Sequence, residues 1–257
     1  MTMEPENTPR ICWKARPDRL KMGDSEVHVW RANLSTDRHT QERLAGCLSP
    51  AERSRAERFV FPRDRHYWAA CHGILREILG LYLNEHPRDI EIVSEPGGKP
   101  RLRQNPSCGE PLVKFNLSHS NGLALVAVTL AVEVGIDVEN VRPGFATAEI
   151  AERYFSLEEQ AELRSLPDEL RTEAFFHCWT RKEAFLKARG QGLATPLDCF
   201  SVSLTPGLPV VLRSTDAPRW HMFSFYPGPD VVAALVAEGT KPEIQFWEWQ
   251  NPTNRKG

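Results

Sequence analysis

Residues 114–140 read KFNLSHSNGLALVAVTLAVEVGIDVEN, and the fold class follows from this stretch. Its apolar residues either alternate with polar ones or form short continuous runs, and both patterns are typical of strands. The pair Asn121-Gly122 is a hairpin turn signal between the first two runs. The stretch therefore predicts three successive strands, over KFNLSHS, LALVAVTL and VEVGIDVEN.

Two helical tracts of similar construction flank this sheet region. The sequences Ser49-Pro50-Ala51-Glu52 and Ser156-Leu157-Glu158-Glu159 are both capping boxes, which begin helices. After each, a proline precedes a long helix, expected over about 64–84 and about 169–189. Strands are expected at 27–34 before the first tract and between 202 and 236 after the second. This order predicts an α+β fold of two lobes, which we place at residues 11–130 and 131–250.

The composition excludes several classes of protein. The chain has 257 residues and a formal net charge of −2, so no global field attracts nucleic acid or an acidic membrane. We expect neither as a partner. The beginning, MTMEPENTPR, has no secretory pattern, and no apolar run is long enough for a membrane span, which predicts a cytoplasmic protein. Six cysteines without a CxxC pair predict reduced thiols rather than a zinc site.

Two carboxylates stand out in GIDVE. Along a strand, alternate residues share a face, so Asp137 and Glu139 project together while Ile136 and Val138 point into the core. Two acids on one face repel each other unless a cation lies between them, and hard oxygen ligands favour Mg²⁺ or Mn²⁺. The alternative is a solvated edge strand with two surface acids.

A further candidate acid, Glu183, lies in the later long helix. Glu183 and Lys187 are four residues apart and therefore neighbours on the helix surface. They form either an exposed ion pair of small energy or, since Glu183 is one turn from Trp179 at the edge of the apolar stripe, part of a half-buried site.

Basic and polar residues could hold a phosphate. Ser118 and His119 end a strand just before a turn, where His119 either donates to a phosphate or simply stabilises the turn. The sequence contains no Walker A loop and no GxGxxG motif, so side chains and a metal would have to hold a phosphate. Arginines concentrate in residues 49–76 and form either a phosphate or nucleic-acid patch or a solvated helix face: Arg53, Arg55, Arg58, Arg63, Arg65 and Arg76.

Five motifs in this order, SPAERSRAERFVFPRDR, GGKP, FNLSHS, GIDVE and FHCWTRKEAFLKARGQGL, resemble the Sfp-type 4′-phosphopantetheinyl transferases. The resemblance covers about residues 49–200. It implies two similar α+β lobes related by pseudo-twofold symmetry, with the active site at their interface, in a protein that acts as a monomer. The implied reaction moves the phosphopantetheine arm of coenzyme A to a serine of an apo acyl, peptidyl or polyketide carrier protein and releases adenosine 3′,5′-bisphosphate.

The resemblance also implies roles for individual residues. Asp137 and Glu183 match the main Mg²⁺ ligands, with Glu139 as a third carboxylate. Glu183 matches the general base as well, so its role as ligand or base stays open. Lys187 matches a contact of the pyrophosphate. The implied contacts of the nucleotide and its 3′-phosphate are Ser118, His119, Arg55 and Lys99.

One position departs from the family pattern. Glu52 stands where a prototype has a basic residue, and Arg53 is its neighbouring substitute. Two other classes of function remain as alternatives, a non-catalytic module that binds coenzyme A or a carrier protein, and a nucleic-acid binder that uses the arginine-rich helices. The sequence leaves open whether the natural carrier serves fatty acid, polyketide or nonribosomal peptide synthesis, and which face docks it.

Overall fold

The structure is a computed structural model that describes residues 11–17, 20–94, 97–104, 112–145, 147–190 and 195–251. The first half of the chain begins with a short strand, continues with a long strand and three helices, and ends with four strands. These elements are β1 (Lys14–Ala15), β2 (Glu26–Asn33), α1 (Arg38–Cys47), α2 (Pro50–Glu57), α3 (Pro62–Leu83), β3 (Ile92–Ser94), β4 (Pro100–Leu102), β5 (Val113–Ser120) and β6 (Leu123–Leu130).

The second half has a long strand, three helices and then further strands. Its elements are β7 (Val134–Asn140), α4 (Thr147–Tyr154), α5 (Leu157–Ser165), α6 (Asp168–Arg189), the 3₁₀ turn η3 (Leu197–Cys199), β8 (Ser201–Val202), β9 (Leu212–Arg213), the 3₁₀ turn η4 (Ala217–Arg219), β10 (Trp220–Gly228), β11 (Val231–Glu238) and β12 (Glu243–Glu248). The mixed α+β class expected from the sequence is confirmed.

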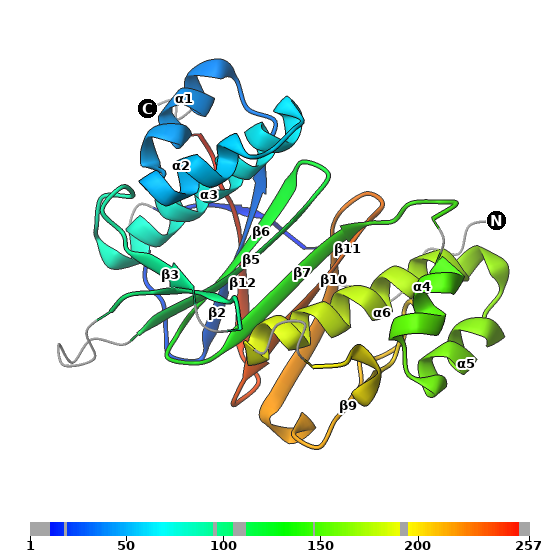
Figure 1. Cartoon of the computed structure of the whole chain (residues 1–257). Coiled ribbons are helices and arrows are strands. Elements are labelled where there is room, and N and C mark those ends of the chain that lie inside the picture. The colour runs from blue at the N-terminus through cyan, green and yellow to red at the C-terminus, as the bar shows by residue number, and fades with distance from the viewer. Residues whose placement is uncertain are drawn as a thin grey trace.

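The long strands form two sheets. One has the strand order β1-β12-β2-β6-β5 and the other β10-β11-β7, while β3-β4 and β8-β9 are separate two-stranded ribbons. Apolar residues of β2 and β6, such as Val29 and Ala127, pack against Ile136 of β7 and Leu235 of β11, so the inner faces of the sheets contact each other. Figure 1 shows α1–α3 on one side of the strands and α4–α6 on the other.

The capping boxes begin their helices as predicted. The Ser49 and Ser156 side chains accept from the backbone N–H of the third helical residue, Glu52 and Glu159, whose carboxylates bind back to the cap N–H. Each long helix ends at a residue in the left-handed conformation, Asn84 for α3 and Gly190 for α6.

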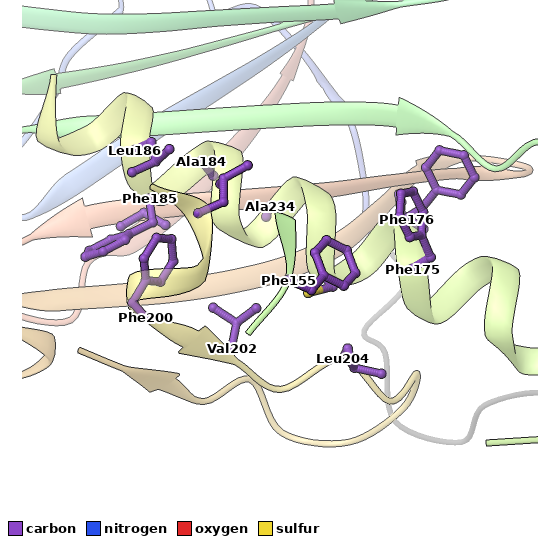
Figure 2. Packing of buried hydrophobic residues seen from close by; sticks show 14 of the residues in the cluster. Phe155, Phe175, Phe176, Ala184, Phe185, Leu186, Phe200, Val202, Leu204 and Ala234 are labelled. Carbon is purple, nitrogen blue, oxygen red and sulfur yellow. The ribbon is translucent and has the colours of Figure 1, made fainter. Parts of the chain in front are cut away.

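The core of the second half surrounds α6. Figure 2 shows Phe175, Phe176, Phe185 and Leu186 of α6 among other buried apolar side chains of this half. The rings of Phe185 and Phe200 lie 4.9 Å apart between centroids in an edge-on arrangement. This packing fixes the rotation of α6 about its own axis.

The last strand lies in the first sheet. β12 pairs with β2 in parallel, with Ile244 opposite Val27 and Trp247 opposite Trp30. The sequence analysis did not predict this strand, although the residues 243–246 alternate between polar and apolar, and its partner β2 is far away in the chain. The division of the chain at residue 130 into two lobes stays a proposal. β12 falls in the second lobe by its sequence position but pairs with a strand of the first.

Among the described residues, no helix is long and apolar enough to cross a membrane. The described cysteines are all free thiols: Cys12, Cys47, Cys71, Cys178 and Cys199. Cys108 lies outside the described residues.

Candidate active site

The strands β5 and β7 lie side by side but belong to different sheets. Side chains of β5 bridge the seam between them. The Asn116 side-chain oxygen accepts from the Ile136 backbone N–H at 2.9 Å, and the Ser118 hydroxyl donates to Asp137 Oδ1 at 2.8 Å. The Ser120 hydroxyl donates to Glu139 Oε2, also at 2.8 Å. The polar residues of FNLSHS therefore hold the two carboxylates of GIDVE in place.

The helix α6 comes close to β7 at a glycine. A Cβ at Gly135 would lie 2.0 Å from the Ala184 carbonyl oxygen and 2.3 Å from the Ala188 backbone nitrogen, so only glycine fits here. This contact brings Glu183 and Lys187, which flank Ala184 and Ala188 on α6, to the side of β7 that carries Asp137.

Asp137 is the central acid of the site. Its side chain is only 6% exposed, and its Oδ1 atom accepts from Lys187 Nζ at 2.6 Å as well as from Ser118. Lys187 also donates to the Ser118 hydroxyl at 3.0 Å. The second oxygen, Oδ2, is buried and has no hydrogen-bond partner. A buried carboxylate oxygen without a donor is costly, and it marks the position of a cationic or hydrogen-bonding ligand.

The carboxylates of Glu139 and Glu183 both have raised pKa values. Burial raises the pKa of Glu139, and the charge of Asp137 raises it further, against smaller opposing effects of Ser120, Arg142 and Lys187. Burial and the charge of Asp137 also raise the pKa of Glu183, with Lys187 opposing. The raised pKa values of Glu139 and Glu183 show repulsion from the neighbouring carboxylates, which a cation bound between them would relieve.

His119 is partly exposed and lies within electrostatic range of Asp137 and Lys187. Burial lowers its pKa, and the charges of His72 and Lys187 lower it further, while Asp137 raises it. A neutral imidazole can donate one hydrogen bond to a phosphate without adding charge.

The chemical type of the carboxylate oxygens at this site suits a divalent cation. Carboxylate oxygens are the ligands that Mg²⁺ and Mn²⁺ prefer, and Asp137 Oδ2 is available to one. In the described part of the chain, however, no three acidic, histidine or cysteine side chains converge closely enough to hold a metal as they stand. Lys187 occupies the other oxygen of Asp137, so its ammonium takes the place of a cation.

The structure brings together five of the residues named from the sequence: Ser118, Asp137, Glu139, Glu183 and Lys187. His119 lies within their electrostatic range. Arg55 is apart from them, on an exposed part of α2 with its guanidinium 5.8 Å from the Trp68 ring. Trp68 stacks on His72, whose charge reaches His119. Arg55 is thus connected to the site through two aromatic side chains rather than by direct contact.

Lys99, an implied nucleotide contact, lines the same cavity of about 250 Å³ as Glu183 and Lys187, and its role toward a nucleotide stays a prediction. Its side chain is 9% exposed, and its ammonium donates to Glu133 and to two backbone carbonyls. Glu52, the departure from the family pattern, has a structural explanation. It closes the capping box of α2 and binds Arg76 at 2.8 Å, while Arg53 donates to the Leu48 carbonyl.

The sequence analysis missed Asn116 and Ser120, which hold β7 from the same face of β5 as Ser118. The signal was available, because Asn116, Ser118 and Ser120 alternate along a predicted strand and must share a face.

Two cavities flank the carboxylates. One of about 250 Å³ lies between the 97–100 loop and α6, and its lining includes Gly98, Asn116, Glu183 and Lys187. A smaller one of about 100 Å³ is lined by Glu139, Arg142 and aromatic residues that include Trp179. Glu183 and Glu139 therefore line different cavities.

Comparison with known proteins identifies this arrangement. The family described as 4′-phosphopantetheinyl transferase, N-terminal, matches residues 32–131, and the 4′-phosphopantetheinyl transferase superfamily matches residues 133–236. The chain belongs to the 4′-phosphopantetheinyl transferase superfamily, and it transfers phosphopantetheine from coenzyme A to carrier proteins.

Within the superfamily, the chain is Sfp-like. It is 40% identical to the 4′-phosphopantetheinyl transferase HetI of Nostoc sp. over 237 residues, which cover 92% of this chain and 98% of that protein. It is 32% identical to Sfp of Bacillus subtilis over 163 residues, 63% of this chain and 69% of Sfp. The crystal structure of the Thermotoga maritima holo-[acyl-carrier-protein] synthase matches with a TM-score of 0.33 and 27% identity, covering 42% of this chain and 62% of that one.

Proposed function

We propose that the transfer depends on Mg²⁺, which Asp137, Glu139 and Glu183 would hold, with Mn²⁺ as a substitute. The observation that carries this proposal is Asp137, a buried carboxylate with a lysine on one oxygen and nothing on the other. A bound divalent cation would supply charge neutralisation at the pyrophosphate. It would also satisfy Asp137 Oδ2 and relieve the repulsion that raises the pKa values of Glu139 and Glu183.

Glu183 would either complete this ligand set or take the proton of the carrier serine, because one carboxylate cannot easily be a tight ligand and a free base together. The pKa of Glu183 is raised, and it lines the 250 Å³ cavity rather than the seam between the strands. A carboxylate with a raised pKa is a better base for a hydroxyl than an ordinary surface glutamate. The serine oxygen forms a bond to the β-phosphorus, the bond from that phosphorus to the bridging oxygen breaks, and adenosine 3′,5′-bisphosphate leaves.

Lys187 neutralises the charge that develops on the leaving group. Its ammonium rests on Asp137 and Ser118 and also lines the 250 Å³ cavity, so it reaches a pyrophosphate there after a small rotation. His119 and Ser118 then face the nucleotide, and Arg55 with its aromatic neighbours extends the basic surface toward the 3′-phosphate.

The acceptor is an apo acyl, peptidyl or polyketide carrier protein, and the enzyme is proposed to act as a cytoplasmic monomer. One chain supplies β5, β7 and α6, the elements that carry the proposed catalytic groups, which supports a site that needs no second copy.

The test is incubation with coenzyme A, a panel of apo carrier proteins and Mg²⁺, followed by intact mass of the carrier. We expect transfer to stop on chelation and to return with Mg²⁺ or Mn²⁺. Asp137→Asn should lower the rate by about 100-fold or more, whereas Glu158→Gln, a change at an exposed acid of α5, should leave it unchanged. Transfer that survives both chelation and Asp137→Asn would exclude the metal site, and binding of coenzyme A without turnover on any carrier would favour a non-catalytic module.

A further inference from the structure

Lys99 connects three separate parts of the molecule. It lies between β3 and β4, and its ammonium donates to Glu133 Oε2 at 2.6 Å, to the Val134 carbonyl at 3.1 Å and to the Ala188 carbonyl at 3.0 Å. Glu133 and Val134 stand at the start of β7, and Ala188 is in the last turn of α6. Lys99 therefore ties a loop of the first half of the chain to the two elements that carry the catalytic groups.

Lys99 lines the 250 Å³ cavity beside Glu183 and Lys187, but its ammonium has no donor left for a ligand there. A lysine has three N–H donors, and each has an acceptor here. The Ala188 carbonyl belongs to the helix C-terminus, where carbonyls lack helical partners and a cation is favourable. Burial raises the pKa of Glu133, but its bonds with Lys114 and Lys99 outweigh this and lower it, so the cluster is paired within the protein.

The positions of these acceptors matter for the site. Val134 adjoins Gly135, and a Cβ at Gly135 would meet backbone atoms of Ala188. Because Lys99 binds the carbonyls of both Val134 and Ala188, it holds both sides of the contact between β7 and α6. This contact sets how far Lys187 and Glu183 on α6 lie from Asp137 on β7. A displacement of about 1 Å in such groups can lower a rate about 100-fold.

We propose that Lys99 is a positioning residue, which fixes the end of α6 against the start of β7, and that it does not contact the nucleotide of coenzyme A through its ammonium. The inference rests on the proposed roles of Asp137, Glu183 and Lys187. It assigns to GGKP a structural function, because Gly98 adopts a φ of +83°, which favours glycine, and Lys99 binds the loop to β7 and α6.

Lys114 provides a matched control. It binds the other oxygen of Glu133, Oε1, at 2.5 Å, and its side chain is 30% exposed. Lys99→Met and Lys114→Met each remove one cation from the same glutamate. Only the first removes a bond to α6.

The experiment measures kcat, the KM for coenzyme A and the affinity for adenosine 3′,5′-bisphosphate by calorimetry. For Lys99→Met we expect kcat to fall about 10- to 100-fold, while the affinity for adenosine 3′,5′-bisphosphate stays within about threefold of wild type. Lys114→Met should change neither. Lys99→Gln, which keeps two N–H donors, should recover part of kcat and serves if Lys99→Met does not fold.

The opposite split would overturn the inference. If Lys99→Met, or Lys99→Gln in its place, weakens adenosine 3′,5′-bisphosphate binding tenfold or more with kcat unchanged, Lys99 contacts the nucleotide directly. Equal loss of kcat in Lys114→Met would mean that the charge of Glu133, not the bond to α6, matters. Failure of the underlying site proposal is distinguishable, since Asp137→Asn would then retain transfer whatever Lys99 does.

Discussion

The first half of the chain runs β2, α1–α3, β3–β6, and the second half repeats this order as β7, α4–α6, β8–β11 (Figure 1). The strand order β2-β6-β5 of one sheet corresponds to β7-β11-β10 of the other. The long helices α3 and α6 each have 22 residues, and each follows a capping-box helix. These correspondences support the pseudo-twofold relation that the resemblance implies, and they allow the halves to be compared position by position.

A buried ion pair occurs at the same place in both halves. Arg76 is the fifteenth residue of α3 and Lys182 the fifteenth of α6. Arg76 binds Glu52 of the first capping box at 2.8 Å and donates to two carbonyls beyond α3, and Lys182 binds Glu159 of the second at 2.8 Å and donates to two carbonyls beyond α6. In each half, the pair fastens the capping-box helix and the following loop to the long helix.

The next residue of each long helix is a glutamate in both halves, but its surroundings differ between them. Glu77, the sixteenth residue of α3, pairs with Arg43 and accepts from the Trp249 indole at 3.1 Å. Glu183, the sixteenth of α6, faces Asp137 and Glu139 instead and has its pKa raised by burial and by their charges.

The residues around Glu77 also differ from those around Glu183. The twentieth residue is Leu81 in α3 and Lys187 in α6, and the cavity beside Glu77, about 300 Å³, is lined by Trp30 and Trp249. A glutamate at this helix position is therefore structural when an arginine neutralises it. Glu183, the counterpart of Glu77, lies near two other acids and is a catalytic group only in the proposed function.

The comparison predicts its largest effect at these two glutamates. Glu183→Gln should lower the rate of holo-carrier formation by about 100-fold or more, because the proposed metal ligand or proton acceptor is lost. Glu77→Gln should leave the rate unchanged and reduce the free energy of unfolding by about 1–3 kcal/mol, since Arg43 loses its charged partner. Intact mass of the carrier and urea unfolding measure the two quantities. Equal losses of activity would show that the two halves do not divide the roles in this way.

The buried pair of the second half gives the next largest effect. Glu159 and Lys182 are 1% and 0% exposed, so Glu159→Gln leaves a buried ammonium with carbonyl partners only. We expect the free energy of unfolding to fall by about 3–5 kcal/mol, measured by urea unfolding, while Glu158→Gln at the exposed neighbour changes it little. Adding Lys182→Met to Glu159→Gln should recover part of the loss. A single substitution without effect would mean that the pair is not what fastens α5 to α6.

Much of this architecture could be predicted from the sequence, because its signals are local. The capping boxes, the long helices and the strands of FNLSHS and GIDVE depend on residues a few positions apart. The placement of Lys99 on Ala188 and of Lys187 on Asp137 depends on partners 89 and 50 positions away. A motif shows that a lysine is near the site, but its bonds depend on which acceptors the fold leaves unsatisfied, and periodicity does not contain that information.

The pair of the first half gives the smallest effect and a test by pH. Burial raises the pKa of Glu52, but the contacts with His72, the Ser49 N–H and Arg76 outweigh it and lower the pKa to about 2 from 4.5. A carboxyl with a depressed pKa in the folded state stabilises the protein fully above the unfolded value, and this contribution is lost as pH falls from about 4.5 toward 2.

Glu52→Gln should therefore cost about 2–3 kcal/mol of unfolding free energy at pH 7 and progressively less below pH 4.5. Urea unfolding of wild type and Glu52→Gln across this range measures the difference, with Glu57→Gln on the exposed face of the same helix as the control. A difference that does not change with pH would assign the cost to lost packing and capping rather than to the charge of Glu52. The ion pairs of the two halves would then be alike in geometry but not in energy. The charge of Glu52 would add little to the stability that Arg76 provides, whereas Lys182 depends on the charge of Glu159.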